Sequence, residues 1–252
     1  MGHILRAISL LTVFPVRANW DGDAELGKAA AFFPLVGAGI GVLAAALGLL
    51  VSMLTASGEA TRLLSAALVL LTLEGLTGFL HLDGWADCCD AFLPALSRER
   101  RLEIMRDPCL GCFGVTGIVL LLLLKLAALA AVLSGARDLA GALPVAVAPV
   151  LSRSGMVLGA RVFPLARSEG MAASLRRGLG PLQVLIAVAM GLGSAALLGW
   201  RGVVCAATEL FSVIAMGRLA RSRIGGSTGD VYGATCELGE TLALVSCALL
   251  GG

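Results

Sequence analysis

The chain has 252 residues, of which 58% are hydrophobic and only 14% charged, and its mean hydropathy is +0.93. Soluble domains carry about 25% charged residues, so this composition excludes a soluble globular domain and indicates a polytopic protein whose surroundings are mostly lipid. The 19 basic and 17 acidic residues nearly balance, which gives no reason to expect a nucleic acid as partner.

The predicted elements begin with an apolar N-terminal segment, residues 1–17, which is interrupted by His3, Arg6 and Pro15. We expect this segment to be interfacial or re-entrant, because it is too short to span a bilayer. About 20 apolar residues are needed for a spanning helix, and the sequence predicts about seven spans: 31–54, 61–81, 110–133, 139–163, 181–199 and the shorter 203–217 and 236–250. Lipid offers no partner to unpaired backbone groups, so the predicted fold is an all-α helical bundle in the membrane, forming one domain over residues 1–252.

The basic residues are distributed unequally between the two sides that these spans define. Three of them fall on one side: Arg62, Arg137 and Arg201. Thirteen fall on the other: Arg6, Arg17, Lys28, Arg98, Arg100, Arg101, Arg106, Arg167, Arg176, Arg177, Arg218, Arg221 and Arg223. Cytoplasmic loops carry the excess of Lys and Arg, so the N-terminus and the three long loops are predicted to be cytoplasmic.

An acidic cluster follows the second predicted span. Asp83, Asp87 and Asp90 are spaced i, i+4, i+7 and therefore line one face of a helix, with no Lys or Arg between residues 72 and 97 to neutralise them. Mg²⁺ binds through one or two carboxylates together with substrate phosphates, so the cluster predicts a Mg²⁺ site that carries a phosphate or pyrophosphate. The alternative is a solvated helix end, which would normally mix both signs of charge.

Two further polar residues precede this cluster. Glu74 lies inside the second predicted span, where a carboxylate is costly unless it is paired or functional; a structural hydrogen bond is the alternative to a catalytic role. His81 is a candidate catalytic base, or a residue that anchors the helix at the membrane boundary. On a continuous helix these two residues face away from the aspartates, so one shared site requires a helix break near Gly84 or a neighbour that encloses it.

Candidate substrate-binding residues lie farther along the chain. Arg106 and Asp107 precede the third span, and Arg153 lies within a span, where a guanidinium needs a polar partner. The last loop contains Arg223 and a Gly-rich turn with Thr228, Gly229 and Asp230. Consecutive backbone N–H groups of such a turn can bind an anion, and Asp230 can add an oxygen ligand, although such a turn often only connects two helices.

The sequence resembles the cobalamin synthase family, the adenosylcobinamide-GDP ribazoletransferases. The resemblance covers most of the chain and rests on motifs that occur in order: Phe33–Gly37, Glu74, the His81-Leu-Asp-Gly-x-x-Asp87-x-x-Asp90 string, Ile104–Asp107 followed by Gly111 and Gly114, Arg153, and Gly226–Asp230 followed by Gly233. It implies a multi-pass enzyme of the bacterial inner membrane that uses Mg²⁺, with its active site facing the cytoplasm. The implied reaction joins adenosylcobinamide-GDP to α-ribazole or its 5′-phosphate and releases GMP.

The resemblance and the charge pattern together suggest roles for these residues. Asp83 and Asp87 are expected to be Mg²⁺ ligands, with Asp230 as an additional one. Asp90 is a ligand or the base that accepts the hydroxyl proton, His81 is the competing base, and Glu74 belongs to the catalytic group. The substrate-binding group consists of Arg106, Asp107, Arg153, Arg223, Thr228 and Gly229.

The alternatives to this enzyme are a transporter and a scaffold. Intramembrane Glu74 and Arg153 would suit a transporter, but transporter sites gather at the bilayer midplane and between repeats, whereas this acidic cluster lies at one edge and no repeat is evident. A scaffold leaves the cluster unexplained. CDP-alcohol phosphotransferases have similar chemistry, but their aspartate motif is not met here. The sequence leaves the oligomeric state open, a homo-oligomer included.

Overall fold

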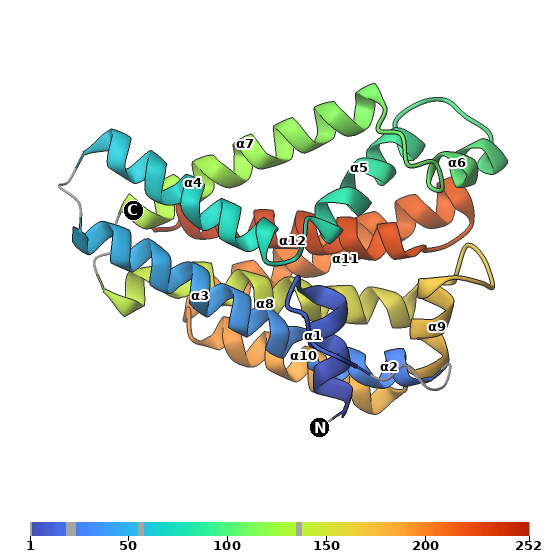
Figure 1. Cartoon of the computed structure of the whole chain (residues 1–252), viewed down its shortest axis with the longest axis horizontal. Helices are drawn as coiled ribbons and strands as arrows, with labels where there is room; N and C mark the ends of the chain where they lie inside the picture. Colours follow the sequence, from blue (N-terminus) through green and yellow to red (C-terminus); the bar gives the residue numbers. More distant parts are fainter. Residues whose placement is uncertain (1, 19–23, 55–57, 135–137, 252) are drawn as a thin grey trace.

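The structure is a computed structural model that describes residues 2–18, 24–54, 58–134 and 138–251. Within these ranges it forms helices and no β-strand, and the long helices run side by side along the longest axis of the molecule (Figure 1). In chain order these are α1 (Gly2–Leu11), α2 (Glu25–Ala29), the 3-10 turn η1 (Ala30–Phe32), α3 (Phe33–Leu54), α4 (Glu59–Gly75), α5 (Leu80–Phe92), α6 (Arg98–Ile104), α7 (Cys112–Ser134), α8 (Leu139–Val162), α9 (Met171–Gly178), α10 (Pro181–Ala196), α11 (Trp200–Ile224) and α12 (Gly229–Leu249).

The all-helical membrane fold is confirmed, but the count of seven spans is not. In the described residues, four helical stretches are long and apolar enough to cross a membrane, and the number rises to six if two bent helix pairs each count as one span. The predicted ranges 203–217 and 236–250 lie inside longer helices, α11 and α12. Helix α12 is long enough to span but is not among the four, and it carries Asp230, Glu237 and Glu240.

The predicted span 61–81 is wrong as a single helix, because the chain bends by 85° between α4 and α5. Helix α4 ends at Gly75, and Phe79 adopts a left-handed φ of 62° that is costly for a residue with a side chain. The backbone N–H of Phe79 donates to the carbonyl of Glu74 at 3.0 Å, and this bond closes the end of α4. The break lies before His81 and not near Gly84, and it turns the acidic face of α5 away from the line of α4.

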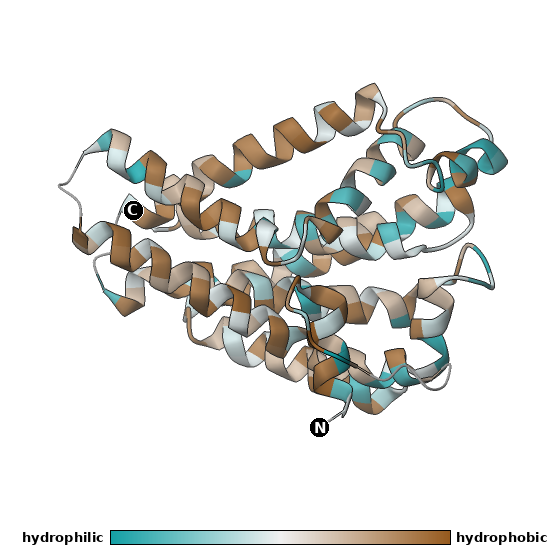
Figure 2. Ribbon diagram, in the orientation of Figure 1, coloured by the Kyte–Doolittle hydropathy of each residue, from teal (hydrophilic) through white to brown (hydrophobic). Residues whose placement is uncertain are grey.

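Helix α8 lies at the centre of the bundle. Its most apolar stretch is 78% buried, against 22% for α7, which exposes much of its apolar surface. Figure 2 shows hydrophobic residues along the outward faces of α3, α4 and α7, which is the pattern of helices whose solvent is lipid. The central position of α8 explains why it carries a buried Arg153 as well as apolar residues.

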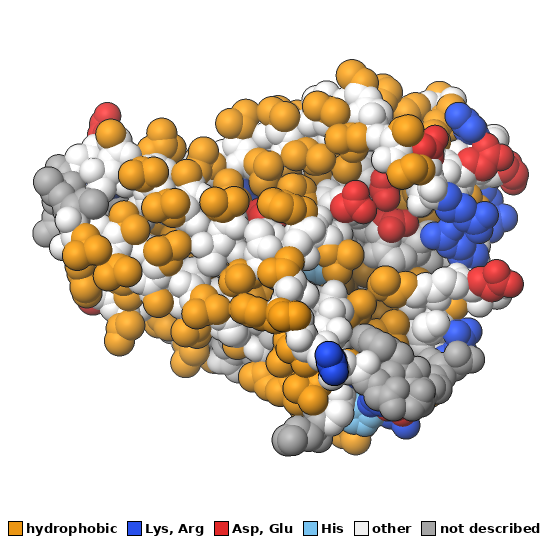
Figure 3. Space-filling view, in the orientation of Figure 1, with side chains coloured by type: hydrophobic (Ala, Val, Ile, Leu, Met, Phe, Trp, Pro, Cys, Tyr) orange, Lys and Arg blue, Asp and Glu red, His pale blue; other side chains and the backbone are white. Residues whose placement is uncertain are grey.

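Charged side chains gather at one end of the molecule (Figure 3), where α5, α6 and α9 lie. The opposite end contains Ser134 of α7, Gly141 of α8, Arg201 of α11 and Cys247 of α12, which line one common cavity. This separation agrees with the unequal distribution of basic residues along the chain. Arg137, one of the three basic residues predicted for the opposite side, lies outside the described residues.

Candidate active site

The site is built where the start of α5 packs against the start of α12. Gly84 lies directly against the Asp230 backbone: a Cβ added at Gly84 would stand 2.7 Å from the carbonyl oxygen of Asp230. Only glycine permits this approach, since real Cβ atoms are not found at that distance. Two segments that lie almost 150 positions apart in the sequence therefore contribute to one surface.

This contact brings carboxylates from both helices together. The carboxylate of Asp87 lies in the electrostatic field of Asp230, Asp83 and Asp90. Asp83 is exposed, while Asp87 and Asp230 are half-buried. Within the described ranges, none of the three lies within ion-pair distance of a Lys or Arg. The predicted proximity of Asp83, Asp87 and Asp230 is therefore present in the fold.

A cavity of about 160 Å³ adjoins the carboxylates. Its polar side chains are His81 and Asp83 of α5, Asp230 and Tyr232 of α12, and Arg167 and Glu169 of the loop between α8 and α9. Its apolar wall comes largely from α1, α2, α3 and α9, including Leu10, Leu26, Phe33 and Met171. The N-terminal helix α1, predicted to be interfacial or re-entrant, forms part of the wall of the cavity.

Two buried polar atoms of residues that line this cavity have no hydrogen-bond partner in the described structure. They are Nε2 of His81 and the hydroxyl of Tyr232, the one tyrosine of the chain. Both side chains are at most 5% exposed. A buried polar group without a partner costs about 1–3 kcal/mol, so both atoms are suited to hydrogen bonding with a bound molecule.

Arg167 is a residue of the site that the sequence interpretation missed. The loop that carries it is held against the α12 start, because Ser227 donates its N–H to the carbonyl of Pro164 at 2.7 Å and Ala166 donates to the carbonyl of Ser227 at 3.0 Å. The positive charge of the Arg167 guanidinium interacts electrostatically with the carboxylate of Asp230. In the sequence, Arg167 is one of thirteen basic residues that are predicted to be cytoplasmic, and no local signal distinguishes it from the others.

Asp90 lies beside the cluster but does not line the cavity. Its two carboxylate oxygens accept the backbone N–H groups of Gly111 and Gly114, each at 2.8 Å, and the side chain is 8% exposed. These bonds fix the loop before α7 and the first turn of α7 against α5. The geometry therefore favours a positioning role over the predicted roles of ligand or base.

Glu74 and Arg153 also lie away from the cavity wall, in a buried ionic network. Lys125 of α7 lies 2.6 Å from a carboxylate oxygen of Glu74, 3.0 Å from one of Glu237 and 2.7 Å from one of Glu240. Arg153 of α8 forms an ion pair with Glu240. Four helices, α4, α7, α8 and α12, are joined by these contacts, so the structure gives both residues structural partners in place of the predicted direct contact with substrate.

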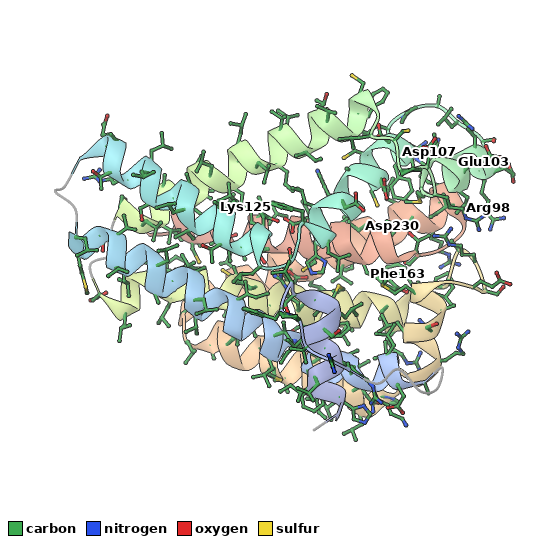
Figure 4. The ribbon with its side chains drawn as sticks, viewed as in Figure 1. Arg98, Glu103, Asp107, Lys125, Phe163 and Asp230 are labelled. Atoms are coloured by element: carbon green, nitrogen blue, oxygen red, sulfur yellow. The ribbon has the colours of Figure 1, made fainter. Side chains whose placement is uncertain are left out.

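The remaining predicted residues divide between the turn before α12 and the periphery. Thr228 caps α12: its hydroxyl accepts the N–H of Val231 at 3.4 Å and donates to Asp230 at 3.0 Å. Gly229 lines the cavity. Arg106, Asp107 and Arg223 are exposed and do not line it, and Figure 4 shows Asp107 farther toward the end of the molecule than Asp230.

Asp107 instead stabilises its own loop. Its carboxylate accepts the backbone N–H of Cys109 at 2.9 Å, and this hydrogen bond lowers the pKa of Asp107 below its ordinary value. Across the described residues, no three His, Cys, Asp or Glu side chains converge closely enough to hold a metal ion by themselves.

Comparison with known proteins gives one consistent family. The family model described as cobalamin-5-phosphate synthase matches residues 3–248. A protein of Geotalea daltonii named adenosylcobinamide-GDP ribazoletransferase is 35% identical over 249 residues, which cover 98% of this chain and 96% of the relative. A protein of Brucella ovis with the same name is 31% identical over 260 residues, covering 99% of this chain and 97% of the relative. No solved structure matches the chain.

Proposed function

The chain belongs to the cobalamin-5-phosphate synthase family, whose members are transferases of cobalamin synthesis, and from this premise we propose that it is an Mg²⁺-dependent adenosylcobinamide-GDP ribazoletransferase. The observation that carries the proposal is the cavity in which Asp83, Asp230, Arg167 and His81 meet. Carboxylates, a guanidinium and an unpartnered imidazole together suit phosphoryl transfer, which needs positioning and charge neutralisation more than covalent help.

The proposed reaction replaces the phosphoanhydride bond of adenosylcobinamide-GDP with a phosphate ester bond to ribazole. A hydroxyl oxygen of α-ribazole or its 5′-phosphate bonds to the phosphorus that is attached to the aminopropanol arm of adenosylcobinamide. The bond from that phosphorus to the oxygen of GMP breaks, GMP leaves with the electron pair, and the hydroxyl proton passes to a base. His81 is the base we propose, because its Nε2 has no hydrogen-bond partner in the described structure and the residue lines the cavity.

Magnesium fits the donor set of the site. Asp83, Asp87 and Asp230 offer hard carboxylate oxygens, which Mg²⁺ prefers, and Mg²⁺ usually takes one or two carboxylates together with substrate phosphates. This mode agrees with the absence, in the described part of the chain, of a group of side chains able to hold a metal alone. We propose that Asp83 and Asp230 are the protein ligands with Asp87 beside them. When bound, Mg²⁺ would neutralise charge on the pyrophosphate.

The other residues of the cavity position the substrates. Arg167 can donate two parallel hydrogen bonds to a phosphate, and the hydroxyl of Tyr232 can bond to a second polar group. A cavity of about 160 Å³ is close to the ~150 Å³ that holds a benzene molecule, so it accommodates one ring system. We therefore propose that the apolar wall receives the benzimidazole of ribazole, while the much larger corrinoid remains at the mouth.

The proposed location is the bacterial inner membrane, with the active site facing the cytoplasm. The end of the molecule that contains the cavity also carries most of the basic residues, and this is the property of cytoplasmic segments. Nucleotide substrates are made in the cytoplasm, so this orientation gives the site access to adenosylcobinamide-GDP.

The test is GMP release by the purified protein in detergent or nanodiscs, supplied with adenosylcobinamide-GDP and α-ribazole 5′-phosphate. We expect equal amounts of GMP and cobalamin 5′-phosphate, loss of both after chelation with EDTA, and recovery when Mg²⁺ is added. Folded protein that forms no product in the presence of Mg²⁺ would contradict the proposal. Uptake of a substrate into vesicles without chemical change would indicate a transporter.

A further inference from the structure

A second cavity, which shares no residue with the cavity at the acidic cluster, lies between α8, α10 and α11. Its volume is about 360 Å³, and its lining is apolar apart from Ser154 and Glu209. Leu192 and Leu210 line it and are about half exposed, so the cavity opens on the apolar outer surface of the bundle. Ser154 donates its hydroxyl to the carbonyl of Val150 at 2.8 Å, so Glu209 is the residue of this lining whose polar side-chain atoms have no hydrogen-bond partner in the described structure.

Glu209 is 4% exposed, and neither of its carboxylate oxygens has a hydrogen-bond partner in the described structure. Such a group costs free energy unless something pairs with it. The cost is notable because the neighbouring buried acids Glu74, Glu237 and Glu240 are all paired with Lys125. Glu209 is therefore the one buried acid of the described bundle interior that lacks a partner.

Two glycines, Gly155 and Gly239, leave space for the two oxygens of this carboxylate. A Cβ added at Gly155 of α8 would stand 1.7 Å from one of its oxygens, and a Cβ added at Gly239 of α12 would stand 1.9 Å from the other. Any residue except glycine at these two positions would therefore collide with the carboxyl group. Gly155 also lines the second cavity, so the carboxyl group lies at the inner wall of that cavity.

The charge balance of the interior indicates which form of Glu209 is present. Two cations, Lys125 and Arg153, are already bonded to three carboxylates. A fourth carboxylate in an apolar wall would have no compensating charge, and such groups avoid the cost by holding a proton. A neutral carboxylic acid both donates and accepts one hydrogen bond, which matches a hydroxyl group and does not require an ion to enter the bilayer.

We propose that this cavity binds an apolar alcohol drawn from the bilayer, with its hydroxyl on Glu209 and its hydrocarbon body against α10 and α11. The volume is more than twice the ~150 Å³ of a cavity that holds benzene, and ligand cavities of this size combine an apolar lining with few polar groups. The carboxyl group sets the orientation of the ligand, and the apolar lining supplies most of the binding free energy.

The test uses two photoreactive probes on the full-length protein in nanodiscs: an octanol that carries a diazirine, and an octane with the same diazirine and no hydroxyl. Peptide mapping by mass spectrometry locates the labelled residues. We expect the alcohol to label residues that line this cavity about fivefold more than the hydrocarbon does, since one hydrogen bond is worth about 1 kcal/mol, and excess octanol to suppress the labelling. Equal labelling by the two probes, or labelling confined to other surfaces, overturns the proposal.

Two variants isolate the carboxyl group. Glu209→Met keeps the length of the side chain and removes its polar atoms, so labelling by the alcohol should fall to the level of the hydrocarbon. Glu209→Gln keeps a donor and an acceptor and should retain most of the labelling. Undiminished labelling of a folded Glu209→Met variant contradicts the proposal. If that variant does not fold, the comparison of the two probes on the unmodified protein decides the matter.

Discussion

Lys125 and Glu74, on helices α7 and α4, form a buried ion pair with 2.6 Å between the ammonium nitrogen and a carboxylate oxygen. Lys125 is fully buried and is shared with Glu237 and Glu240 of α12, and Figure 4 shows it in the interior of the bundle. The network joins the helix that precedes the acidic face of α5 to the helix that supplies Asp230. It therefore stabilises the packing of the helices that carry the candidate site.

Removal of the shared cation should destabilise the protein strongly. Lys125→Met leaves Glu74 and Glu237 without their cation, and breaking a buried pair in this way costs about 3–5 kcal/mol. The measurement is thermal unfolding in detergent. The matched control is Arg100→Ala, which removes an exposed ion pair in which a guanidinium nitrogen lies 2.9 Å from a carboxylate oxygen of Glu103. Exposed ion pairs contribute little to the free energy of unfolding. Similar melting temperatures for both variants would contradict the structural role of the network.

The contact between α5 and α12 should tolerate no added side chain. In Gly84→Ala the new Cβ would stand 2.7 Å from the carbonyl oxygen of Asp230, so α12 must move and the acidic residues must separate. We expect the rate of GMP release to fall at least about tenfold, because small misplacements of catalytic groups are costly. Gly39→Ala is the control, since nothing lies within 4 Å of the added Cβ. Normal activity of the Gly84→Ala variant would mean that the contact does not position the site.

Asp83 and Asp230, two of the carboxylates that line the cavity, should be essential for turnover. Asp83→Asn and Asp230→Asn remove negative charge with little change in shape, and each should lower kcat at least about a hundredfold, since metal-ion stabilisation is worth several kcal/mol and each 1.4 kcal/mol is tenfold. Higher Mg²⁺ should restore part of the loss. Glu103→Gln, an exposed acid at the same end of the molecule, is the control. Rates near normal for Asp83→Asn would identify the cluster as a solvated helix end.

Asp90 should affect stability more than metal binding. In Asp90→Asn, one of the two backbone N–H groups, of Gly111 or Gly114, faces an amide NH₂ and loses its acceptor, at a cost of about 1–3 kcal/mol. We expect a lower melting temperature and an unchanged Mg²⁺ concentration for half-maximal activity. The carboxylate of Asp107 is exposed and bonds within its own loop, to Cys109, so Asp107→Asn should unfold close to the wild-type temperature. A large increase in the Mg²⁺ requirement of Asp90→Asn would instead assign Asp90 as a metal ligand.

Arg167 should contribute to binding of the nucleotide substrate. A charged hydrogen bond is worth about 1.5–3 kcal/mol, so Arg167→Ala should lower kcat/KM for adenosylcobinamide-GDP about tenfold to a hundredfold, chiefly through KM. Arg161→Ala is the control, because Arg161 is an exposed arginine near the end of α8 that does not line the cavity. Equal kinetics for the two variants would indicate that Arg167 does not bind the substrate and contributes only to the orientation of the protein in the membrane.

Much of the site could be predicted from the sequence, because the relevant information is local. Asp83, Asp87 and Asp90 recur at helical spacing, and they stand out in a chain with 14% charged residues. The Gly-rich turn before Asp230 and the apolar runs are likewise visible without a structure. In lipid, an unpaired charge is costly, so the composition alone indicated that each intramembrane charge has a partner or a function.

Only the tertiary structure decided whether a given intramembrane charge has a structural partner or a function. Glu74 and Arg153 have the sequence signature of functional residues, but Lys125 and Glu240 reach them from distant segments and pair with them. Arg167 resembles any other loop arginine until the pairing of its loop with Ser227 places it beside Asp230. Both outcomes depend on contacts between residues far apart in the chain, and sequence spacing determines such contacts only within a single helix.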